Sequence, residues 1–262
     1  RVRFFRSTNM GVNNHGAVEI SKDKGYTRYF LDGLGYSVPQ GRTFLLPDYV
    51  SLIDNNLRRY GFSGYPQAEV DAIDAYIRDT VGYPCFVKAN EGSQGRGVHK
   101  CYDADDVRAA VEDFAREKVR VCVVERDVAL PDYRVLVWGG MVRMAYHRKP
   151  FTVAGDGAST IRQLIEAAQT DFNARGRSAL VDAADSRLNA MLTRQGYKAD
   201  AIPQNGVQVQ IHAFSNASTG GAVEDVTGRL HTHWNELCVR VTAEMGLRLC
   251  GVDLACADIE SA

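Results

Sequence analysis

The sequence predicts an α+β protein in which antiparallel hairpins lie between amphipathic helices. Two hairpins carry this prediction, because short apolar strands flank glycine turns within residues 85–102 and 133–147. Apolar residues recur at helical spacing outside these hairpins, for example in residues 103–118. The sequence has no regular strand–helix–strand alternation, so the pattern favours an α+β architecture over a parallel α/β sheet.

Composition narrows the class further. The chain has 262 residues, 45% of them hydrophobic, which is enough for a sizeable core in one or two domains. A formal net charge of -1 provides no general attraction to nucleic acid, and no apolar stretch approaches the roughly 20 residues that span a bilayer. The six cysteines lack CxxC spacing, which favours buried, reduced thiols in a cytoplasmic protein. We therefore expect neither nucleic acid nor a membrane as a partner.

The first half of the chain is predicted to form three helices, one hairpin and one strand. These elements cover residues 23–34 (helix), 68–80 (helix), 85–102 (hairpin), 103–118 (helix) and 119–125 (strand). The first helix stops at Gly33 and Gly35, the second has apolar residues on one face, and Asp103 is a typical N-cap for the third. A run of apolar, β-branched residues predicts the strand. Residues 1–20 show no clear periodicity.

The second half is predicted to contain more strands. Its elements cover residues 133–147 (hairpin), 160–168 (helix), 186–194 (helix), 207–213 (strand), 234–245 (helix) and 248–255 (strand). Gly139-Gly140 is a strong turn signal for the hairpin, and Thr160 with Gln163 fits a capping box at the start of the first helix. Alternation in the 207–213 strand predicts burial of one face only, whereas the last strand reads as buried.

The hairpin of residues 85–98, CFVKA followed by NEGSQGRGV, is the first candidate site. In a P-loop a lysine follows the last glycine, and in a dinucleotide fingerprint a helix follows the loop. Here Lys88 precedes the loop and a second strand follows it. This order suggests a flexible flap over nucleotide phosphates with Lys88 beneath it. An ordinary glycine-rich hairpin with a solvated lysine is the alternative.

Further polar residues at strand ends could bind a nucleotide. Glu125 ends a strand whose free backbone groups could hold an adenine edge, and Asp132 could accept hydrogen bonds from ribose hydroxyls. Solvated charges at a strand end are the alternative for both. The loop 215–221, SNASTGG, is either a plain turn or a loop that presents Asn216 and backbone N–H groups to a phosphate.

Charged residues also interrupt apolar strands in the second half. Arg134 and Arg148 lie on the two strands of the Gly139-Gly140 hairpin, where an unpaired charge is costly. They would suit a carboxylate or phosphoryl ligand, and structural ion pairs are the alternative. Asp253 lies within an apolar run, and a buried acid requires a partner or a metal ion.

Taken together, these pieces resemble the ATP-grasp ligase superfamily, and in particular the ATP-grasp module of cyanophycin synthetases. The resemblance runs from Ile20 to Ile259. It rests on the segments SKDKGYTRYFLDGLGYSVPQG, YPCFVKANEGSQGRGV, DYRVLVWGGMV, GDGASTIRQLI, RQGYKADAIPQNG, SNASTGGAVEDVTGRLH and GLRLCGVDLACADI, in this order. The GDGASTI and STGG segments point to a branch that also resembles bifunctional glutathione synthetases.

The resemblance implies a fold of two α+β lobes with ATP bound between them, and it implies a role for each matched residue. ATP-binding positions are Lys24, Lys88, Ser93, Gln94, Gly95, Gly97, Val98, Glu125, Arg126, Val128 and Asp132. Positions near the γ-phosphate and the acyl-phosphate intermediate are Arg134, Arg148 and Asn216. Asp253 matches the first of the family's acidic magnesium ligands. The expected organisation is an N-terminal segment (1–80), a small lobe (81–129) and a large lobe (130–262).

The resemblance further implies an ADP-forming carboxylate–amine ligase that uses ATP and Mg²⁺. Its substrates would be a small-molecule carboxylate and an amine, from an amino acid or peptide, and a homo-oligomer is expected from related ligases. An ATP-binding module without ligase activity, an ATP-grasp kinase and a carboxylate–thiol ligase are the alternatives. The family's Glu-x-Asn metal motif would follow the last strand, and residue 262 comes before it. We expect the domain to continue past this point; absence of a full metal site is the other possibility.

Overall fold

The computed structural model describes residues 11–59, 69–92, 95–177, 181 and 185–262. The chain forms two compact units. The first consists of Arg1–Ala129, Trp138–Gly140 and Val239–Cys250, and the second of Leu130–Val137, Met141–Cys238 and Gly251–Ala262. The strand pairings that the structure gives in both units are antiparallel, and helices accompany the sheets, which confirms the predicted α+β class.

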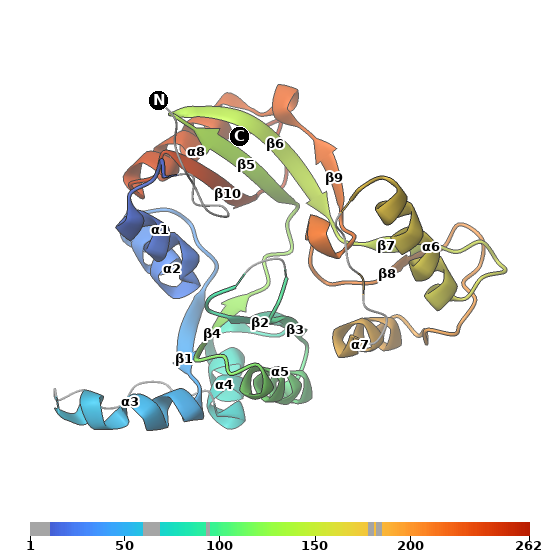
Figure 1. Ribbon diagram of the computed structural model, residues 1–262, viewed down its shortest axis with the longest axis horizontal. Coiled ribbons are helices and arrows are strands. Elements are labelled where there is room, and N and C mark those ends of the chain that lie inside the picture. Colours follow the sequence, from blue (N-terminus) through green and yellow to red (C-terminus); the bar gives the residue numbers. More distant parts are fainter. Residues whose placement is uncertain (1–10, 60–68, 93–94, 178–180, 182–184) are drawn as a thin grey trace. The chain divides into compact units, whose positions relative to one another are not determined.

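The first unit is built on a four-stranded sheet with the order β1-β4-β2-β3 (Figure 1). Its strands are β1 (Gly41–Leu45), β2 (Cys85–Ala89), β3 (Val98–Cys101) and β4 (Val121–Arg126). The predicted glycine hairpin is confirmed, since β2 and β3 pair antiparallel with Lys88 opposite Val98. Along β2, alternate residues Cys85, Val87 and Ala89 are buried. Lys88 therefore lies on the opposite face of the strand from this buried row.

Helices α4 (Val70–Tyr76) and α5 (Ala104–Arg116) pack together and share a hydrophobic core with these strands (Figure 1). Both helices were predicted, and Asp103 caps α5 by accepting hydrogen bonds from the N–H groups of Asp105 and Asp106. The predicted 68–80 helix begins later, and its last turn, Ile77–Val81, is π-helical. Ile73 and Phe114 are fully buried, so each helix contributes its apolar stripe to this core.

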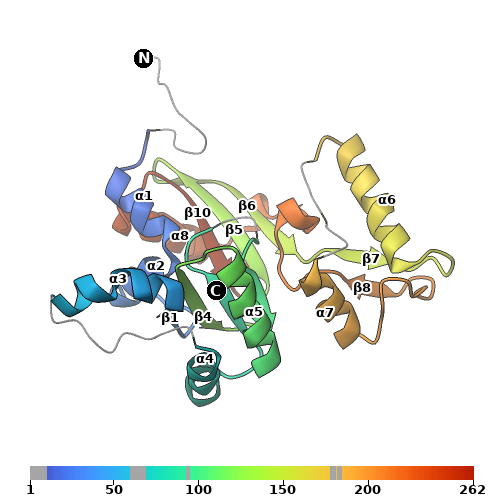
Figure 2. The same ribbon diagram turned by 60° about the horizontal axis from the view of Figure 1, so that its bottom comes forward.

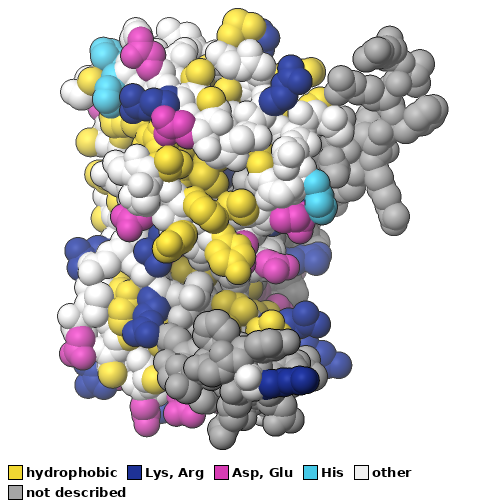
Figure 3. Space-filling view, turned by 90° about the vertical axis from the view of Figure 1, so that its left-hand side faces the viewer, with side chains coloured by type: hydrophobic (Ala, Val, Ile, Leu, Met, Phe, Trp, Pro, Cys, Tyr) yellow, Lys and Arg dark blue, Asp and Glu magenta, His cyan; other side chains and the backbone are white. Residues whose placement is uncertain are grey.

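The N-terminal part of the first unit contains three elements that periodicity did not predict: α1 (His15–Lys22), β1 and α3 (Pro47–Arg59). Helix α1 has no buried residue, so it carries no apolar stripe that a sequence pattern could reveal. Helix α2 (Lys24–Gly33) was predicted and begins at its N-cap, Asp23. Hydrophobic side chains are exposed on this side of the protein in Figure 3, and those on α2 include Tyr26, Tyr29 and Phe30.

The second unit is built on a sheet with the order β10-β5-β6-β9. Its strands are β5 (Asp132–Trp138), β6 (Met141–Lys149), β9 (Ala222–Asp225) and β10 (Leu249–Ala255), and helix α8 (Thr232–Glu244) precedes β10. The Gly139-Gly140 hairpin is confirmed, because both glycines have positive φ, 60° and 77°, as a two-residue hairpin turn requires. The prediction that the last strand is buried was wrong: β10 is only partly buried, and the Asp253 side chain is 56% exposed.

A smaller part of this unit surrounds the pair β7 (Thr152–Ala154) and β8 (Gln208–Gln210), with α6 (Ile161–Ala174) and α7 (Ser186–Arg194) beside it (Figure 2). Its core cluster includes Ile161, Ile165, Leu188, Leu192 and Val209. The predicted capping box of Thr160 and Gln163 is confirmed, and α6 runs past the predicted end. The 207–213 strand is shorter than predicted. Ile211 and His212 are both buried beyond it, because regular pairing stops at Gln210.

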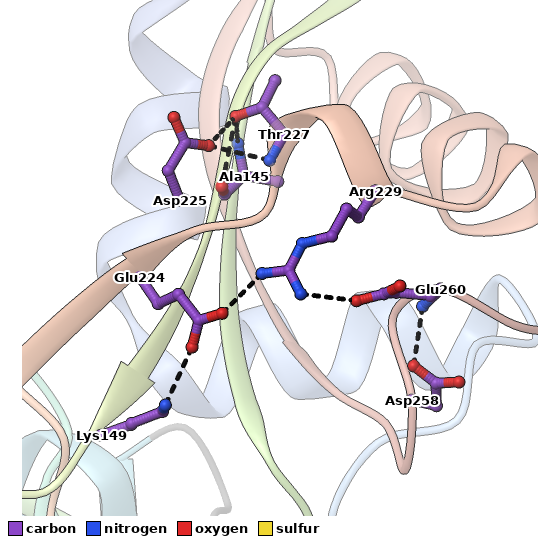
Figure 4. A network of polar contacts seen from close by, with 8 residues as sticks. All are labelled: Ala145, Lys149, Glu224, Asp225, Thr227, Arg229, Asp258 and Glu260. Atoms are coloured by element: carbon purple, nitrogen blue, oxygen red, sulfur yellow. Dashed lines mark hydrogen bonds and ion pairs between the residues drawn. The ribbon is translucent and has the colours of Figure 1, made fainter.

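An ionic network holds the end of β6 to β9 and to the C-terminal segment (Figure 4). Glu224 accepts hydrogen bonds from Lys149, at 2.8 Å, and from Arg229, at 2.5 Å, and Arg229 also contacts Glu260 at 2.7 Å. The hydrogen bond from Lys149, followed by that from Arg229, lowers the pKa of Glu224 to about 2. The Glu224 carboxylate therefore stays charged at neutral pH, and the network holds β6, the strand that carries Arg148, to β9.

None of the helices in the described parts of the chain combines the length and the apolar character that a membrane span would require.

Candidate functional site

Lys88 and Glu125 form an ion pair across neighbouring strands of the first unit. The Lys88 Nζ lies 2.6 Å from Glu125 Oε2, and the side chains are only 24% and 11% exposed. The pairing of β2 with β4 places Phe86 opposite Glu125, two positions from Lys88 on the same face. Glu125 is thus not a solvated acid at a strand end, and that alternative is wrong for this residue. The Lys88 ammonium also lies 5.0 Å from the Phe86 ring centroid.

Lys24 reaches the base of the same hairpin from the first turn of α2. Its Nζ donates to the carbonyl oxygens of Ala89, at 2.8 Å, and Asn90, at 3.2 Å, with Gly92 O at 3.4 Å. Burial, followed by the nearby charge of Lys88, lowers the pKa of Lys24. Two cations from distant segments are therefore held near one another beside a glycine-rich loop. That charge arrangement suits the phosphates of a nucleotide.

The glycine loop itself has little room for side chains where it returns to β3. Gly97 has φ 58°, and a Cβ there would lie 2.9 Å from the Ala89 Cβ. Its carbonyl accepts a 2.7 Å hydrogen bond from the Ala89 N–H, which closes the hairpin before Val98. Gly95 has φ 76°. Two predicted loop residues, Ser93 and Gln94, lie outside the described residues.

The segment after Glu125 was predicted to contact the nucleoside. The Arg126 guanidinium donates to the carbonyls of Thr80 and Val81, both at 3.0 Å, and its backbone N–H donates to Gln40 O at 2.8 Å. Arg126 is therefore held by structural contacts, whereas Val128 is 37% exposed. The nucleotide roles of both residues stay predictions.

Four charged residues meet on the sheet of the second unit. Arg148 on β6 contacts Asp132 at 2.6 Å and Asp253 at 3.0 Å, and Arg134 on β5 contacts Asp253 at 2.9 Å. The two arginines thus form ion pairs, which was one of the two alternatives for them. Burial raises the pKa of Asp132, and the hydrogen bond from Arg148 opposes this shift. Burial by itself would lower the pKa of Arg148, but the negative charges of Asp253 and Asp132 outweigh it, so the pKa of Arg148 is raised. The Arg148 Nε is buried without a hydrogen-bond partner in the described structure, so the guanidinium has unused donor capacity.

Gly251 makes room for one of these arginines, a role that the sequence pattern did not reveal. A Cβ at position 251 would lie 2.4 Å from Arg134 Nε and 2.7 Å from its Nη2. The Arg134 guanidinium therefore lies directly over the backbone of β10. With any larger residue at position 251, the Arg134 guanidinium would have to move from its present place, in which it contacts Asp253.

Arg177 holds the loop that contains Asn216, a role that the sequence pattern did not indicate. Its Nη2 donates to Ala217 O at 3.0 Å and to Gly221 O, so one guanidinium binds both ends of the loop. Between them, residues Ala217–Thr219 form the 3-10 helix η2, and Asn216 O accepts hydrogen bonds from Thr219 and Gly221. The loop is therefore a short, internally hydrogen-bonded 3-10 turn, and the phosphate role of Asn216 stays a prediction. The side-chain amide of Asn216 has no hydrogen bond with the described residues.

Asp253 was predicted as a magnesium ligand, and the donor chemistry fits. Magnesium is commonly held by one or two carboxylates together with substrate phosphates. Asp253 offers an exposed carboxylate, although both its oxygens accept from Arg134. Within the described residues, no three His, Cys, Asp or Glu side chains gather as a preformed metal cluster. One carboxylate plus phosphate oxygens is thus the arrangement that these residues allow.

Comparisons with known proteins give relatives that match most of this chain. It is 31% identical over 247 residues to a cyanophycin synthetase from Synechocystis, which covers 92% of this chain and 26% of that protein. It is also 31% identical over 248 residues to the glutathione biosynthesis bifunctional protein GshAB from Mannheimia succiniciproducens, covering 92% of this chain and 30% of that protein. The chain thus spans less than a third of the length of these curated relatives. No family model matches it.

Solved structures show the same fold. A bifunctional glutathione synthetase from Pasteurella multocida matches 95% of this chain and 31% of that chain, with a TM-score of 0.50 and 23% identity. A D-alanine–D-alanine ligase from Bacillus anthracis matches 94% of this chain and 56% of that chain, with a TM-score of 0.52 and 12% identity. The chain therefore shares the fold of these ligases, and its sequence is similar to those of the cyanophycin synthetases and the GshAB proteins.

Proposed function

We propose that this chain is the ATP-grasp part of an ATP-dependent carboxylate–amine ligase that forms an amide bond through an acyl phosphate. The observation that carries the proposal is the meeting of Lys24 and Lys88 at the base of the glycine-rich hairpin. Two neighbouring cations beside a glycine-rich loop suit an anionic ligand such as the phosphates of a nucleotide. The sequence relationship to cyanophycin synthetase and GshAB supports a ligase over other nucleotide-binding proteins.

In the proposed reaction, an oxygen of the substrate carboxylate attacks the γ-phosphorus of ATP, and the bond from that phosphorus to the β,γ-bridging oxygen breaks to release ADP. The amine nitrogen then attacks the acyl carbon, loses a proton, and displaces inorganic phosphate. Lys24 and Lys88 bind the ATP phosphates, and the hairpin loop covers them. Charge stabilisation and positioning provide the catalysis, and no protein nucleophile takes part.

The charged cluster in the second unit suits the phosphoryl group during its transfer from ATP to the carboxylate. It consists of Arg134, Arg148, Asp132 and Asp253. Arg148 has an unused buried donor, and Arg134 can exchange its Asp253 contact for a carboxylate or phosphoryl oxygen. Asn216 offers an amide to the acyl phosphate. Magnesium, when bound with ATP, neutralises phosphate charge, and Asp253 is the residue that would hold it.

The substrates are proposed as a small-molecule carboxylate and the amine of an amino acid or peptide, because relatives are named for glutathione and cyanophycin synthesis. All six cysteines are free thiols, which supports a reducing, cytoplasmic location. A homo-oligomer stays a prediction.

The decisive experiment is a screen of amino acids and dipeptides in pairs, which follows ADP release with Mg·ATP and identifies products by mass. We expect one pair to yield a condensed product that has lost one water. Lys88→Met should abolish the signal, and the control Lys22→Met should not, since Lys22 is an exposed lysine paired with Glu19. A phosphorylated product without condensation would indicate a kinase, and a thiol acceptor a carboxylate–thiol ligase. ATP binding without turnover on any pair would indicate a binding module.

A further inference from the structure

Asn90 lies at the junction of the two candidate phosphate-binding lysines, and neither the sequence motifs nor the proposed mechanism assigns it a role. It follows directly after β2 and is 5% exposed. Its side-chain Oδ1 accepts a 2.9 Å hydrogen bond from the Gly25 N–H, and its Nδ2 donates to Asp23 Oδ2 at 2.6 Å. One partner is a donor and the other an acceptor, so an amide fits here in one orientation only.

The backbone of Asn90 makes a second set of contacts. Its N–H donates to Val121 O at 2.9 Å, which fixes it to β4. Its carbonyl accepts from the Lys24 N–H at 3.2 Å and from the Lys24 Nζ at 3.2 Å. Asn90 thus joins the end of β2 to the first turn of α2 through both backbone and side chain.

Asp23 completes the junction from the helix side. Its Oδ2 accepts from Asn90, and its Oδ1 accepts a 2.7 Å hydrogen bond from the Tyr26 N–H as the N-cap of α2. The fit is close, because a Cβ at Gly25 would lie 2.6 Å from the Thr43 Cγ2 and 3.3 Å from the Asn90 Oδ1. The first turn of α2 is therefore packed closely against Thr43 and Asn90.

We propose that Asn90 is a positioning residue that fixes the first turn of α2 to the end of β2, so that Lys24 and Lys88 bind the same nucleotide phosphates. The inference rests on the proposed function, because it takes ATP as the ligand of both lysines. Lys24 is the residue between the two side-chain contacts of Asn90, at Asp23 and Gly25. Loss of the amide therefore releases Lys24 on both sides, while Lys88 stays in its strand.

The first test is Asn90→Asp, which changes one atom and no volume. Two carboxylates would then face each other across the present 2.6 Å contact, where like charges repel strongly. We expect ATP affinity, measured by isothermal titration calorimetry with Mg·ATP, to fall by about tenfold or more at neutral pH, because residues in one hydrogen-bond network are energetically coupled. Affinity should partly recover in mild acid, because the two carboxylates can then share a proton.

The second test is the exchanged pair Asn90→Asp with Asp23→Asn. Asp at position 90 would accept from the Gly25 N–H and from the Asn amide at position 23, whose oxygen would still cap α2 at Tyr26. The number of hydrogen bonds is the same as in the natural chain, with the amide and carboxylate exchanged. We expect the double variant to regain ATP affinity to within about threefold of the natural chain, a coupling that independent sites would not show.

The matched control is Asp103→Asn, which alters the N-cap aspartate of α5 in the same unit. It should lower the thermal unfolding midpoint slightly and leave ATP affinity unchanged. If Asn90→Asp binds ATP as tightly as the natural chain, or if the exchanged pair regains thermal stability without regaining affinity, the positioning role is overturned. If the natural chain itself does not bind ATP, the proposed function fails. If the natural chain binds ATP and Asn90→Asp binds it equally well, only the positioning role fails, so the two failures are distinguishable.

Discussion

Replacing Lys88 by Met separates the role of this lysine in binding from its role in the fold. The Lys88–Glu125 pair joins two mostly buried side chains, and Met keeps most of the length of the lysine side chain while removing its charge. Breaking a buried ion pair by removing one partner costs about 3–5 kcal/mol, because the other charge stays buried and unpaired. Exposed pairs contribute only about 0–1 kcal/mol.

The expected cost lies between these limits. The side chains are 24% and 11% exposed, and Lys24 remains as a second cation near Glu125. We therefore expect Lys88→Met to lower the free energy of unfolding by about 2–3 kcal/mol. A domain with about 5–15 kcal/mol of stability stays folded after such a loss. The urea midpoint should fall by about 1 M, for an m-value of about 2–3 kcal/mol/M.

The double variant Lys88→Met with Glu125→Gln then distinguishes stability from binding. Because Gln removes the unpaired charge, the double variant should recover most of the lost stability. Its affinity for ATP should remain low, since a hydrogen bond between charged groups contributes about 1.5–3 kcal/mol, which is roughly 10- to 150-fold in affinity. Glu125→Gln alone keeps the lysine charge and should still bind Mg·ATP in titration calorimetry.

Two results would refute this reasoning. If the double variant binds ATP within about threefold of the natural chain, the Lys88 charge does not contact phosphate. If Lys88→Met unfolds at the natural urea midpoint, Glu125 does not depend on its partner, and the burial argument fails.

Three more predictions concern the charged groups. Gly251→Ala should displace the Arg134 guanidinium, because the new Cβ would lie 2.4 Å from its Nε. We expect the rate of ADP release to fall at least about tenfold, and the free energy of unfolding to change by less than about 1 kcal/mol. Gly228→Ala is the control in the same assay, because a Cβ at position 228 has nothing within 4 Å. Asp253→Asn should raise the magnesium concentration needed for half-maximal ADP release, and an unaltered magnesium titration would remove Asp253 from the metal site. The affinity for ATP should fall as pH rises through the lowered pKa of Lys24, below its usual 10.5, because ATP binds the charged form. Lys24→Arg should move this decline to higher pH, since the guanidinium stays charged to about pH 12 or above, and a decline that does not move would assign it to another group.

Most helices and hairpins could be predicted because their periodicity reports burial of one face. The α5 segment shows this well: Asp103 caps it, and Val107, Ala110 and Phe114 are buried at helical spacing. Helix α1 and strand β1 were missed because α1 buries no residue and β1 buries only Phe44. The last strand was misread because its apolar composition resembled that of a core strand, whereas β10 is only partly buried.

For the candidate site, the sequence shows which residue types are present, whereas the fold shows which of them make contact. The order of residues along the chain is enough to show which chemistry is present: Lys88 before a glycine loop, Glu125 at a strand end, and Arg134, Arg148 and Asp253 within apolar strands. These residue types in this order were enough to identify the ATP-grasp resemblance. Such motifs can be recognised in the sequence, because each consists of a few neighbouring residues.

Which of these residues meet depends on the order of the strands and the packing of the helices. The tertiary structure paired Lys88 with Glu125, brought Lys24 to the carbonyls of the hairpin, and placed Arg148 against two acids. It also revealed the contacts of Asn90, a residue of the glycine-loop segment to which the sequence assigned no role. The physical reason is that hydrogen bonds and ion pairs form between atoms about 3 Å apart, whatever their separation along the chain. Sequence spacing specifies that distance within a helix or a turn, but strand order and helix packing specify it everywhere else.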